Sequence, residues 1–337
     1  MMENKDILLD LVTIYAAILT LVFIFCGQLP YFTIKVKSQL QYNYRTSLEH
    51  NFPIHLENDF QFKDSNNETG YPYLIVPNSV HYVLFDVHQI ELSHYVSILS
   101  VLKNQKPDII WIHCNCGQLY GQYYKKVIER VKQTNTVFEI RRIEKPTEIF
   151  GQVLSQKSLN WHSSAITRIR VLQQFGGIYL DRDVYVVKSL DPFRRFEMTL
   201  SWNEGLYLGN QVLVAHRKAR FLQKWLDCYH DYRSDSWYYN AGELPTKSIL
   251  WKHPELVHRV KGQFGDDGPR VCPMIFSVYY PEWRRDFFTL HLVIRGDQIV
   301  LKDWCFDQKY PQFMKFNETI ARQLNVTFGE MFRDLFV

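Results

Sequence analysis

The sequence predicts an α/β domain with a mostly parallel sheet, preceded by one N-terminal transmembrane helix. Three observations support this prediction. Apolar segments of strand length alternate with amphipathic segments of helix length from about residue 80 onward. Hydrophobic residues make up 46% and charged residues 22% of the 337 residues, as in a chain with a packed core. An apolar stretch near the N-terminus is long enough to cross a bilayer.

The alternating segments can be placed in order along the chain. Short apolar or β-branched runs indicate strands, and apolar residues repeated every three or four positions indicate helices. We expect strands at 80–85, 108–113, 138–140 and 178–180, and helices at 88–103, 120–132 and 163–175. Gly176 and Gly177 end the last of these helices. Strands that alternate with helices are joined by crossovers, so neighbouring strands run parallel.

The first 72 residues differ from the rest of the chain. Residues 7–26 are apolar apart from Asp10, and they form a longer run than the core of a usual signal peptide, without a clear cleavage pattern. A polar stretch follows. We therefore expect a cytosolic tail at 1–6, a transmembrane signal anchor at 7–26, a stem at 27–72 and a luminal domain at 73–337.

Glycosylation signals favour the luminal side for this domain. The tripeptides that begin at Asn67, Asn317 and Asn325 match the acceptor pattern for N-linked glycans. The predicted protein is therefore a single-pass type II protein of the Golgi or endoplasmic reticulum membrane. One or two disulfides and one leftover thiol are expected in that oxidising compartment. Only one residue separates Cys114 from Cys116, which is not the spacing of a zinc site.

The charge distribution argues against nucleic acid as a partner. The chain has 39 basic and 35 acidic residues, and its net charge is +4. Its basic pairs, such as Arg141-Arg142, are scattered along the sequence. A nucleic-acid interface would need these charges to cluster on one face or in one arm.

Two carboxylates stand where a strand of the predicted sheet ends. Asp181 and Asp183 follow the strand 178–180 and are separated by one residue. In an extended chain alternate side chains point to the same side, and ligands of parallel sheets bind beyond the carboxyl ends of strands. Carboxylate oxygens of this kind bind Mg²⁺ or Mn²⁺, whose open positions take a diphosphate. Such an ion would offset charge on a departing diphosphate.

The surroundings of these acids are similar to a known family. Residues 164–184, SAITRIRVLQQFGGIYLDRDV, resemble the sugar-binding DXD region of glycosyltransferases that include fungal Golgi mannosyltransferases and the α-1,4-glycosyltransferases of glycolipid synthesis. Weaker likeness extends from Val80 to about Arg295. The resemblance implies a single nucleotide-diphospho-sugar transferase domain of the GT-A type, with Mn²⁺ or Mg²⁺ as cofactor. It also implies a UDP- or GDP-sugar donor, a glycan, glycolipid or glycoprotein acceptor, and a hexosyltransferase-like reaction with retention of configuration.

The resemblance further assigns roles to five residues. Asp181 and Asp183 match the acids of the motif, and His291 matches a histidine that often completes the metal site. Arg168 matches a helix arginine that faces the donor, and Asn210 matches an asparagine on a strand near the sugar. A buried structural histidine is an equally compatible interpretation of His291. No catalytic residue is assigned, because no nucleophile is agreed upon for retaining enzymes of this fold.

Three positions depart from the family pattern. Ala165 stands where the family normally has Asp, Leu84 where it often has Trp, and Arg182 where small or apolar residues are usual. These differences define an alternative, a glycosyltransferase-fold binding protein with weakened or lost catalysis. Arg182 would either pair with the two acids or reach a donor phosphate. We also expect Asp183→Ala to abolish donor binding with little loss of thermal stability, since a strand-end carboxylate would be exposed.

Overall fold

The computed structural model describes residues 62, 67–295, 298–299 and 317–337. The predicted tail, the transmembrane anchor at 7–26 and most of the stem lie outside these residues. Across the described ranges, no helix combines the length and the apolar character needed to cross a membrane.

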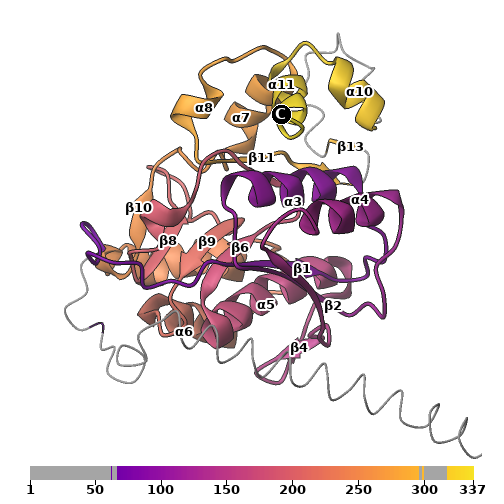
Figure 1. The fold of residues 1–337 in the computed structure, drawn as a ribbon. Coiled ribbons are helices and arrows are strands. Elements are labelled where there is room, and N and C mark those ends of the chain that lie inside the picture. The colour runs from indigo at the N-terminus through magenta and orange to yellow at the C-terminus, as the bar shows by residue number, and fades with distance from the viewer. Residues whose placement is uncertain (1–61, 63–66, 296–297, 300–316) are drawn as a thin grey trace, which may run out of the picture. The chain divides into compact units, whose positions relative to one another are not determined.

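A seven-stranded sheet forms the centre of the domain (Figure 1). In spatial order its strands are β10 (His258–Val260), β8 (Met198–Ser201), β9 (Val212–Ala215), β6 (Gly177–Leu180), β1 (Ser79–Leu84), β2 (Ile109–Cys114) and β3 (Val137–Arg142). All neighbours run parallel except β9, which is antiparallel to both β6 and β8. The predicted α/β domain with a mostly parallel sheet is therefore confirmed.

Helices cover both faces of this sheet. Helices α3 (Leu92–Asn104) and α4 (Gln122–Val131) lie on one face, and α5 (Leu159–Phe175) and α6 (Arg220–Asp227) lie on the other (Figure 1). Because both faces are covered, the residues of β1 and β2 are buried throughout, which explains their continuous apolar runs. All strands and helices predicted up to residue 180 are present, and only their ends differ from the predicted ones.

The remaining elements are short. The strands are β4 (Glu148–Ile149), β5 (Gln152–Val153), β7 (Val184–Val186), β11 (Thr289–His291), β12 (Ile294–Arg295) and β13 (Gln298–Ile299). The helices are α7 (Gly268–Phe276), α8 (Trp283–Asp286), α10 (Glu318–Gln323) and α11 (Thr327–Asp334). Short helical turns are η2 (Gln156–Ser158), η3 (Asp191–Phe193), η4 (Cys228–Asp231), η5 (Tyr239–Glu243), η6 (Thr246–Leu250) and η7 (Pro254–Leu256). Strand β11 pairs antiparallel with β7, which places His291 opposite Val184.

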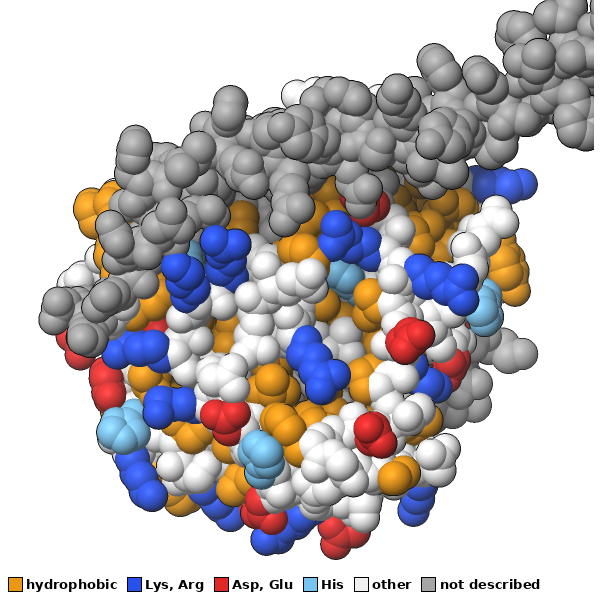
Figure 2. All heavy atoms as spheres, turned by 90° about the horizontal axis from the view of Figure 1, so that it is seen from below, with side chains coloured by type: hydrophobic (Ala, Val, Ile, Leu, Met, Phe, Trp, Pro, Cys, Tyr) orange, Lys and Arg blue, Asp and Glu red, His pale blue; other side chains and the backbone are white. Residues whose placement is uncertain are grey.

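A hydrophobic core between α5, α6 and the sheet fixes the position of α5. Ile166 and Ile169 of α5 and Phe221 and Trp225 of α6 have no exposed surface. Burying each such side chain stabilises the fold by about 1.5–3 kcal/mol. Helix α5 is thereby fixed against the strand that leads to Asp181. On the outer face of α5 and α6, basic, acidic and hydrophobic side chains are interspersed (Figure 2), as the scattered charges of the sequence led us to expect.

The last residues of the predicted stem pack onto the domain. Asn67 is 6% exposed; its Nδ2 donates to the Glu255 carbonyl at 2.9 Å, and its Oδ1 accepts from the Glu197 N–H at 3.1 Å. Asn67 is therefore a structural residue, and its side-chain nitrogen is not accessible to a glycan in the folded domain. The other two acceptors, Asn317 and Asn325, are exposed.

Four of the six cysteines lie in the described residues. Cys114 and Cys116 form a disulfide at the end of β2, and Cys272 is also disulfide-bonded. Cys228 is a free thiol. This pattern agrees with the expectation of one or two disulfides and one leftover thiol.

Buried neutral histidines make this fold acid-sensitive. His81 on β1 and His113 on β2 are 3.0 Å apart (Nδ1 to Nε2) and almost wholly buried. Burial lowers the pKa of His113 to about 3, with Arg141 adding to the effect, and burial also lowers the pKa of His81. In the unfolded chain these groups take up protons near pH 6.5. The contribution of these two histidines to the free energy of unfolding is therefore fully present above pH 6.5 and is lost as the pH falls below this value.

We expect the free energy of unfolding to be smaller at pH 5 than at pH 7.5, by about 2 kcal/mol for each fully buried histidine. The histidines with a lowered pKa are His81, His94, His113, His162, His216 and His258. His291 has a raised pKa and acts in the opposite direction. Urea denaturation at the two pH values and constant ionic strength measures the difference. Equal midpoints would contradict it.

Candidate active site

The two acids of the motif occupy a tight turn at the carboxyl end of β6. The Val184 N–H donates to the Asp181 carbonyl at 3.1 Å, which closes a turn from Asp181 to Val184. The chain is therefore not extended here. Within this turn the two carboxylates have different partners: Asp181 contacts Arg168 and Tyr179, whereas Asp183 contacts His291.

Asp183 is buried and pairs with His291, which is partly exposed. Its Oδ1 lies 3.2 Å from His291 Nε2, and its Oδ2 accepts from the Ile294 N–H at 2.9 Å. Burial alone would raise the pKa of Asp183, but His291, Arg182 and the Ile294 N–H outweigh it and lower this pKa. Burial alone would lower the pKa of His291, but Asp183 leads the carboxylates that raise it. Asp183 is 6% exposed, so the prediction of an exposed carboxylate is wrong.

Asp181 is held by a second cluster. Its Oδ1 accepts from the Tyr179 hydroxyl at 2.7 Å and lies 3.2 Å from Arg168 Nη2. The Arg168 guanidinium also stacks over the Tyr179 ring, 4.5 Å from its centroid. Burial would lower the pKa of Arg168, but Asp181 and Tyr179 outweigh it and raise this pKa. Arg168 thus holds a buried positive charge next to the first acid of the motif.

The same guanidinium reaches the loop before β9. Arg168 Nη1 donates to the Asn210 carbonyl at 2.6 Å and to Asn210 Oδ1 at 3.0 Å. Asn210 Nδ2 in turn donates to the Ala241 carbonyl of η5 at 3.1 Å. Asn210 was expected on a strand, but it lies before the first residue of β9, Val212. The fold nevertheless brings Asn210 and Asp181 into contact with the same Arg168 guanidinium.

Arg182 stands between the acids without pairing with either of them. Its side chain is half-buried, and it makes no ion pair or hydrogen bond with any residue that the structure describes. The arginine that engages an acid of the motif is Arg168 instead. Of the two roles expected for Arg182, a direct ion pair with the acids is therefore not the one seen, although its charge helps to lower the pKa of Asp183.

The other positions that depart from the family pattern are apolar and buried. Leu84 ends β1 and is 2% exposed, and Ala165 on α5 is 4% exposed. Glu204, in the loop after β8, is exposed and pairs with Lys261 at 2.6 Å. Glu204 is thus a surface carboxylate.

Sequence reasoning missed Asp266, which lies near this site and near Tyr238. Asp266 lies close to Gly209, where an added Cβ would be 2.2 Å from Asp266 Oδ2. Burial raises the pKa of Asp266. Tyr238 donates its hydroxyl hydrogen to the Leu208 carbonyl, and burial raises its pKa, with Asp266 adding to the effect. The Gly-Asp-Asp-Gly run that begins at Gly265 was the available signal for Asp266.

Two of the three predicted metal ligands are placed to share an ion. Asp183 Oδ1 and His291 Nε2 are 3.2 Å apart, close to the separation of about 3 Å between adjacent ligands that each lie about 2.1 Å from an octahedral ion. Asp181 is instead bonded to Arg168 and Tyr179. Among the described residues, no three His, Cys, Asp or Glu side chains form a metal-binding group. The Asp183–His291 pair fits an ion, and the complete predicted set is not assembled.

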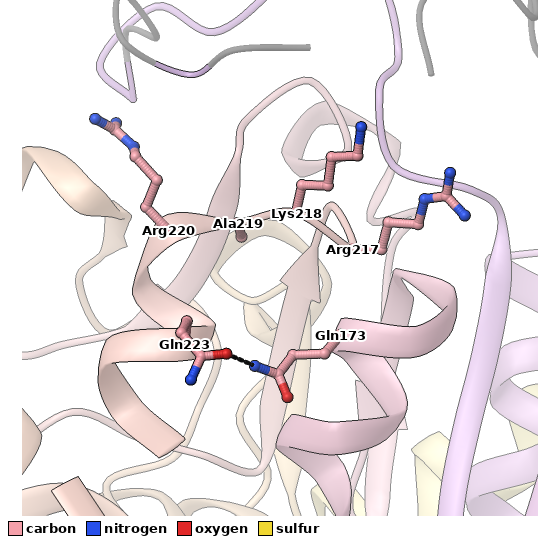
Figure 3. Close-up of a pocket in the computed structure, with 6 residues that line it drawn as sticks. All are labelled: Gln173, Arg217, Lys218, Ala219, Arg220 and Gln223. Carbon is pink, nitrogen blue, oxygen red and sulfur yellow. Dashed lines mark hydrogen bonds between the residues drawn. The ribbon is translucent and has the colours of Figure 1, made fainter. Parts of the chain in front are cut away.

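A basic pocket lies at the other end of β6. Figure 3 shows its lining residues, Gln173, Arg217, Lys218, Ala219, Arg220 and Gln223. Ala215 of β9 pairs with Gly177 at the start of β6, so the loop after β9 lies at the amino end of that strand. Asp181 follows the carboxyl end. The pocket is therefore separate from the candidate active site.

Comparison with known proteins finds similarity in the part of the chain that contains Asp181 and Asp183. Residues 79–200 match the model of the glycosyltransferase sugar-binding region containing the DXD motif. The chain is 25% identical over 204 residues to glucan organizing enzyme 1 of Cryptococcus neoformans var. grubii, which is 55% of this chain and 52% of that protein. It is 32% identical over 91 residues to an uncharacterized protein of Arabidopsis thaliana, 26% of this chain and 14% of that protein. The chain thus spans about half the length of the first relative and less of the second.

Solved structures also align with the domain. The glycosyltransferase GlyE of Streptococcus pneumoniae TIGR4 aligns with a TM-score of 0.43 and 11% identity over 77% of this chain and 63% of that chain. The PaToxG glycosyltransferase aligns with a TM-score of 0.39 and 19% identity over 55% of this chain and 71% of that chain.

The segment matched by the family model runs from β1 into β8. It includes Arg168, Asp181 and Asp183, whereas Asn210 and His291 lie beyond it. The family resemblance that the sequence suggested is therefore confirmed over residues 79–200, which match the glycosyltransferase sugar-binding region containing the DXD motif.

Proposed function

We propose that this protein is a metal-dependent glycosyltransferase that moves a hexose from a UDP- or GDP-sugar to a glycan, glycolipid or glycoprotein. One observation carries the proposal. The Asp183–His291 pair adjoins Asp181 at the carboxyl end of β6, which is where ligands bind in sheets of this kind. The family match over the same segment supports it.

The residues of the site divide into two groups with different tasks. Asp183 and His291 would hold Mn²⁺ or Mg²⁺, and the ion would supply positive charge to the donor diphosphate. Arg168 places a second positive charge beside Asp181 and is oriented by its two bonds to Asn210. Arg182 has no partner among the described residues, so its guanidinium is free to bind a donor phosphate. A GT-A type domain and retention of configuration are part of the proposal and rest on the family resemblance.

A luminal location is also part of the proposal. The Cys114–Cys116 disulfide and the disulfide-bonded Cys272 favour an oxidising compartment. Exposed glycan acceptors at Asn317 and Asn325 agree with it. We propose that residues 7–26 anchor the protein in the Golgi or endoplasmic reticulum membrane.

A second function remains, a binding protein of this fold without turnover. Two observations favour it. Asp181 is engaged by Arg168 and Tyr179, and Ala165, where the family normally has a carboxylate, is buried on the same helix as Arg168. Such a protein would bind donor but would not cleave it.

Thermal shift of the full-length protein tests both functions. We expect stabilisation that requires Mn²⁺ together with one UDP- or GDP-sugar; saturation a hundredfold above Kd adds about 2.7 kcal/mol. Slow release of free nucleotide from the same sample would then identify a transferase, and binding without release would identify the alternative. Glu204→Gln is the control, because it changes an exposed carboxylate outside the site. Donor and Mn²⁺ should raise its melting temperature as much as that of the wild type. No shift with any donor would contradict both functions.

A further inference from the structure

Two exposed tryptophans meet beside the candidate active site. The rings of Trp161 and Trp237 lie 6.0 Å apart, centroid to centroid, with 53° between their planes. Trp161 is 44% exposed and Trp237 is 60% exposed. In contrast, Trp225 and Trp283 are at most 1% exposed and belong to the core. The exposed surface of the Trp161–Trp237 pair adds little to the packed core, and it is accessible to a ligand.

Trp161 lies on the face of α5 that carries Arg168. Trp161, Ala165 and Arg168 are spaced by four and then three residues, so they share one side of the helix. Side chains of a helix lean toward its N-terminus. Arg168 Nε accordingly lies 3.4 Å from the Ser164 carbonyl, one turn nearer to Trp161. The tryptophan therefore adjoins the end of the site at which Arg168 pairs with Asp181.

Trp237 is connected to the site from the other side. Its ring lies 4.9 Å from that of Tyr238, whose hydroxyl donates to the Leu208 carbonyl. The π-helical turn η5 begins at the next residue, and its Ala241 carbonyl accepts from Asn210. Irregular turns of this kind often mark functional sites. The tryptophan pair is thus continuous with the Arg168–Asn210 contact through α5 and through η5.

We infer that the Trp161–Trp237 pair is the binding platform for the acceptor, and that this acceptor presents a neutral hexopyranose. The inference rests on the proposed function. A flat aromatic ring packs on the apolar C–H face of a pyranose, and polar groups at its edge orient the hydroxyls. The charges nearby on η5 and η6 neutralise each other, since Lys247 pairs with Glu243 at 2.6 Å. An uncharged sugar suits this surface better than an acidic one.

Tryptophan fluorescence of the full-length protein tests the platform. The probes are maltohexaose, cellohexaose, mannohexaose and chitohexaose, each titrated with Mn²⁺ and UDP present. At least one of them should change the emission of the wild type. Trp237→Ala should weaken that binding about tenfold, as loss of a stacked ring predicts. Trp251→Ala is the matched control, because Trp251 is 61% exposed and has no ring contact with the pair. Its affinity should equal that of the wild type.

Different outcomes separate this inference from the proposed function. If donors stabilise the wild type but Trp237→Ala binds every probe like Trp251→Ala, the platform is overturned and the transferase stands. If no donor binds while oligosaccharide binding still depends on Trp237, the proposed transferase function is wrong. The tryptophan pair would then be the carbohydrate-binding site of a protein with a different function. Binding to phosphatidylcholine vesicles that depends on Trp237, with no response to the four sugars, would identify a lipid contact and overturn the inference.

Discussion

Replacing Asp183 by Asn is expected to abolish Mn²⁺-dependent binding of the nucleotide-sugar. The amide lacks the negative charge that a hard divalent ion requires, and it no longer pairs with His291. Its oxygen still accepts from the Ile294 N–H. Isothermal titration with donor and Mn²⁺ measures the loss, which should exceed a hundredfold.

Asp183→Ala adds a stability defect to the loss of binding. It leaves His291 and the Ile294 N–H without their buried partner, which costs about 3 kcal/mol. This outcome differs from the one that the sequence suggested, because Asp183 is buried. Urea denaturation of the Asn and Ala variants separates the two effects. Donor binding of normal affinity in a folded Asp183→Asn protein would remove Asp183 from the site.

Gly177→Ala should cause a large loss of stability. Gly177 has φ +109, and an added Cβ would lie 2.3 Å from Ser79 Oγ and 2.7 Å from the Ser79 carbonyl oxygen. The positive φ costs an L-residue about 1–2 kcal/mol, and the forced shift of β1 adds about 1–3 kcal/mol. For a domain of this size the melting temperature should fall by about 10 °C.

Gly117→Ala is the control for this change. Gly117 is exposed, and nothing lies within 4 Å of its added Cβ. Its melting temperature should stay within about 2 °C of the wild type, because surface changes of this kind alter stability by about 0.5 kcal/mol at most. Equal melting temperatures for the two variants would show that β1 and β6 approach each other less closely than described.

Local patterns in the sequence were sufficient for the first half of the domain. The strands and helices up to Leu180 follow from periodicity, since strands buried on both faces need continuous apolar runs and covering helices need one apolar face. Gly176 and Gly177 at the end of α5 required no tertiary information, because a chain reversal there needs positive φ. Asp181 at the carboxyl end of β6 follows from the same order of elements.

Contacts between distant segments were decided only by the tertiary structure. The sequence alone determined an α/β sheet with acids after β6, because periodicity and glycine positions act locally. It did not determine that a turn separates Asp181 from Asp183, or that Arg168 rather than Arg182 engages Asp181. The pairing of β11 with β7 brings His291 to Asp183, and the packing of η5 against α5 brings Trp237 to Trp161. Such contacts depend on how whole elements pack, and no local pattern in either segment encodes its partner.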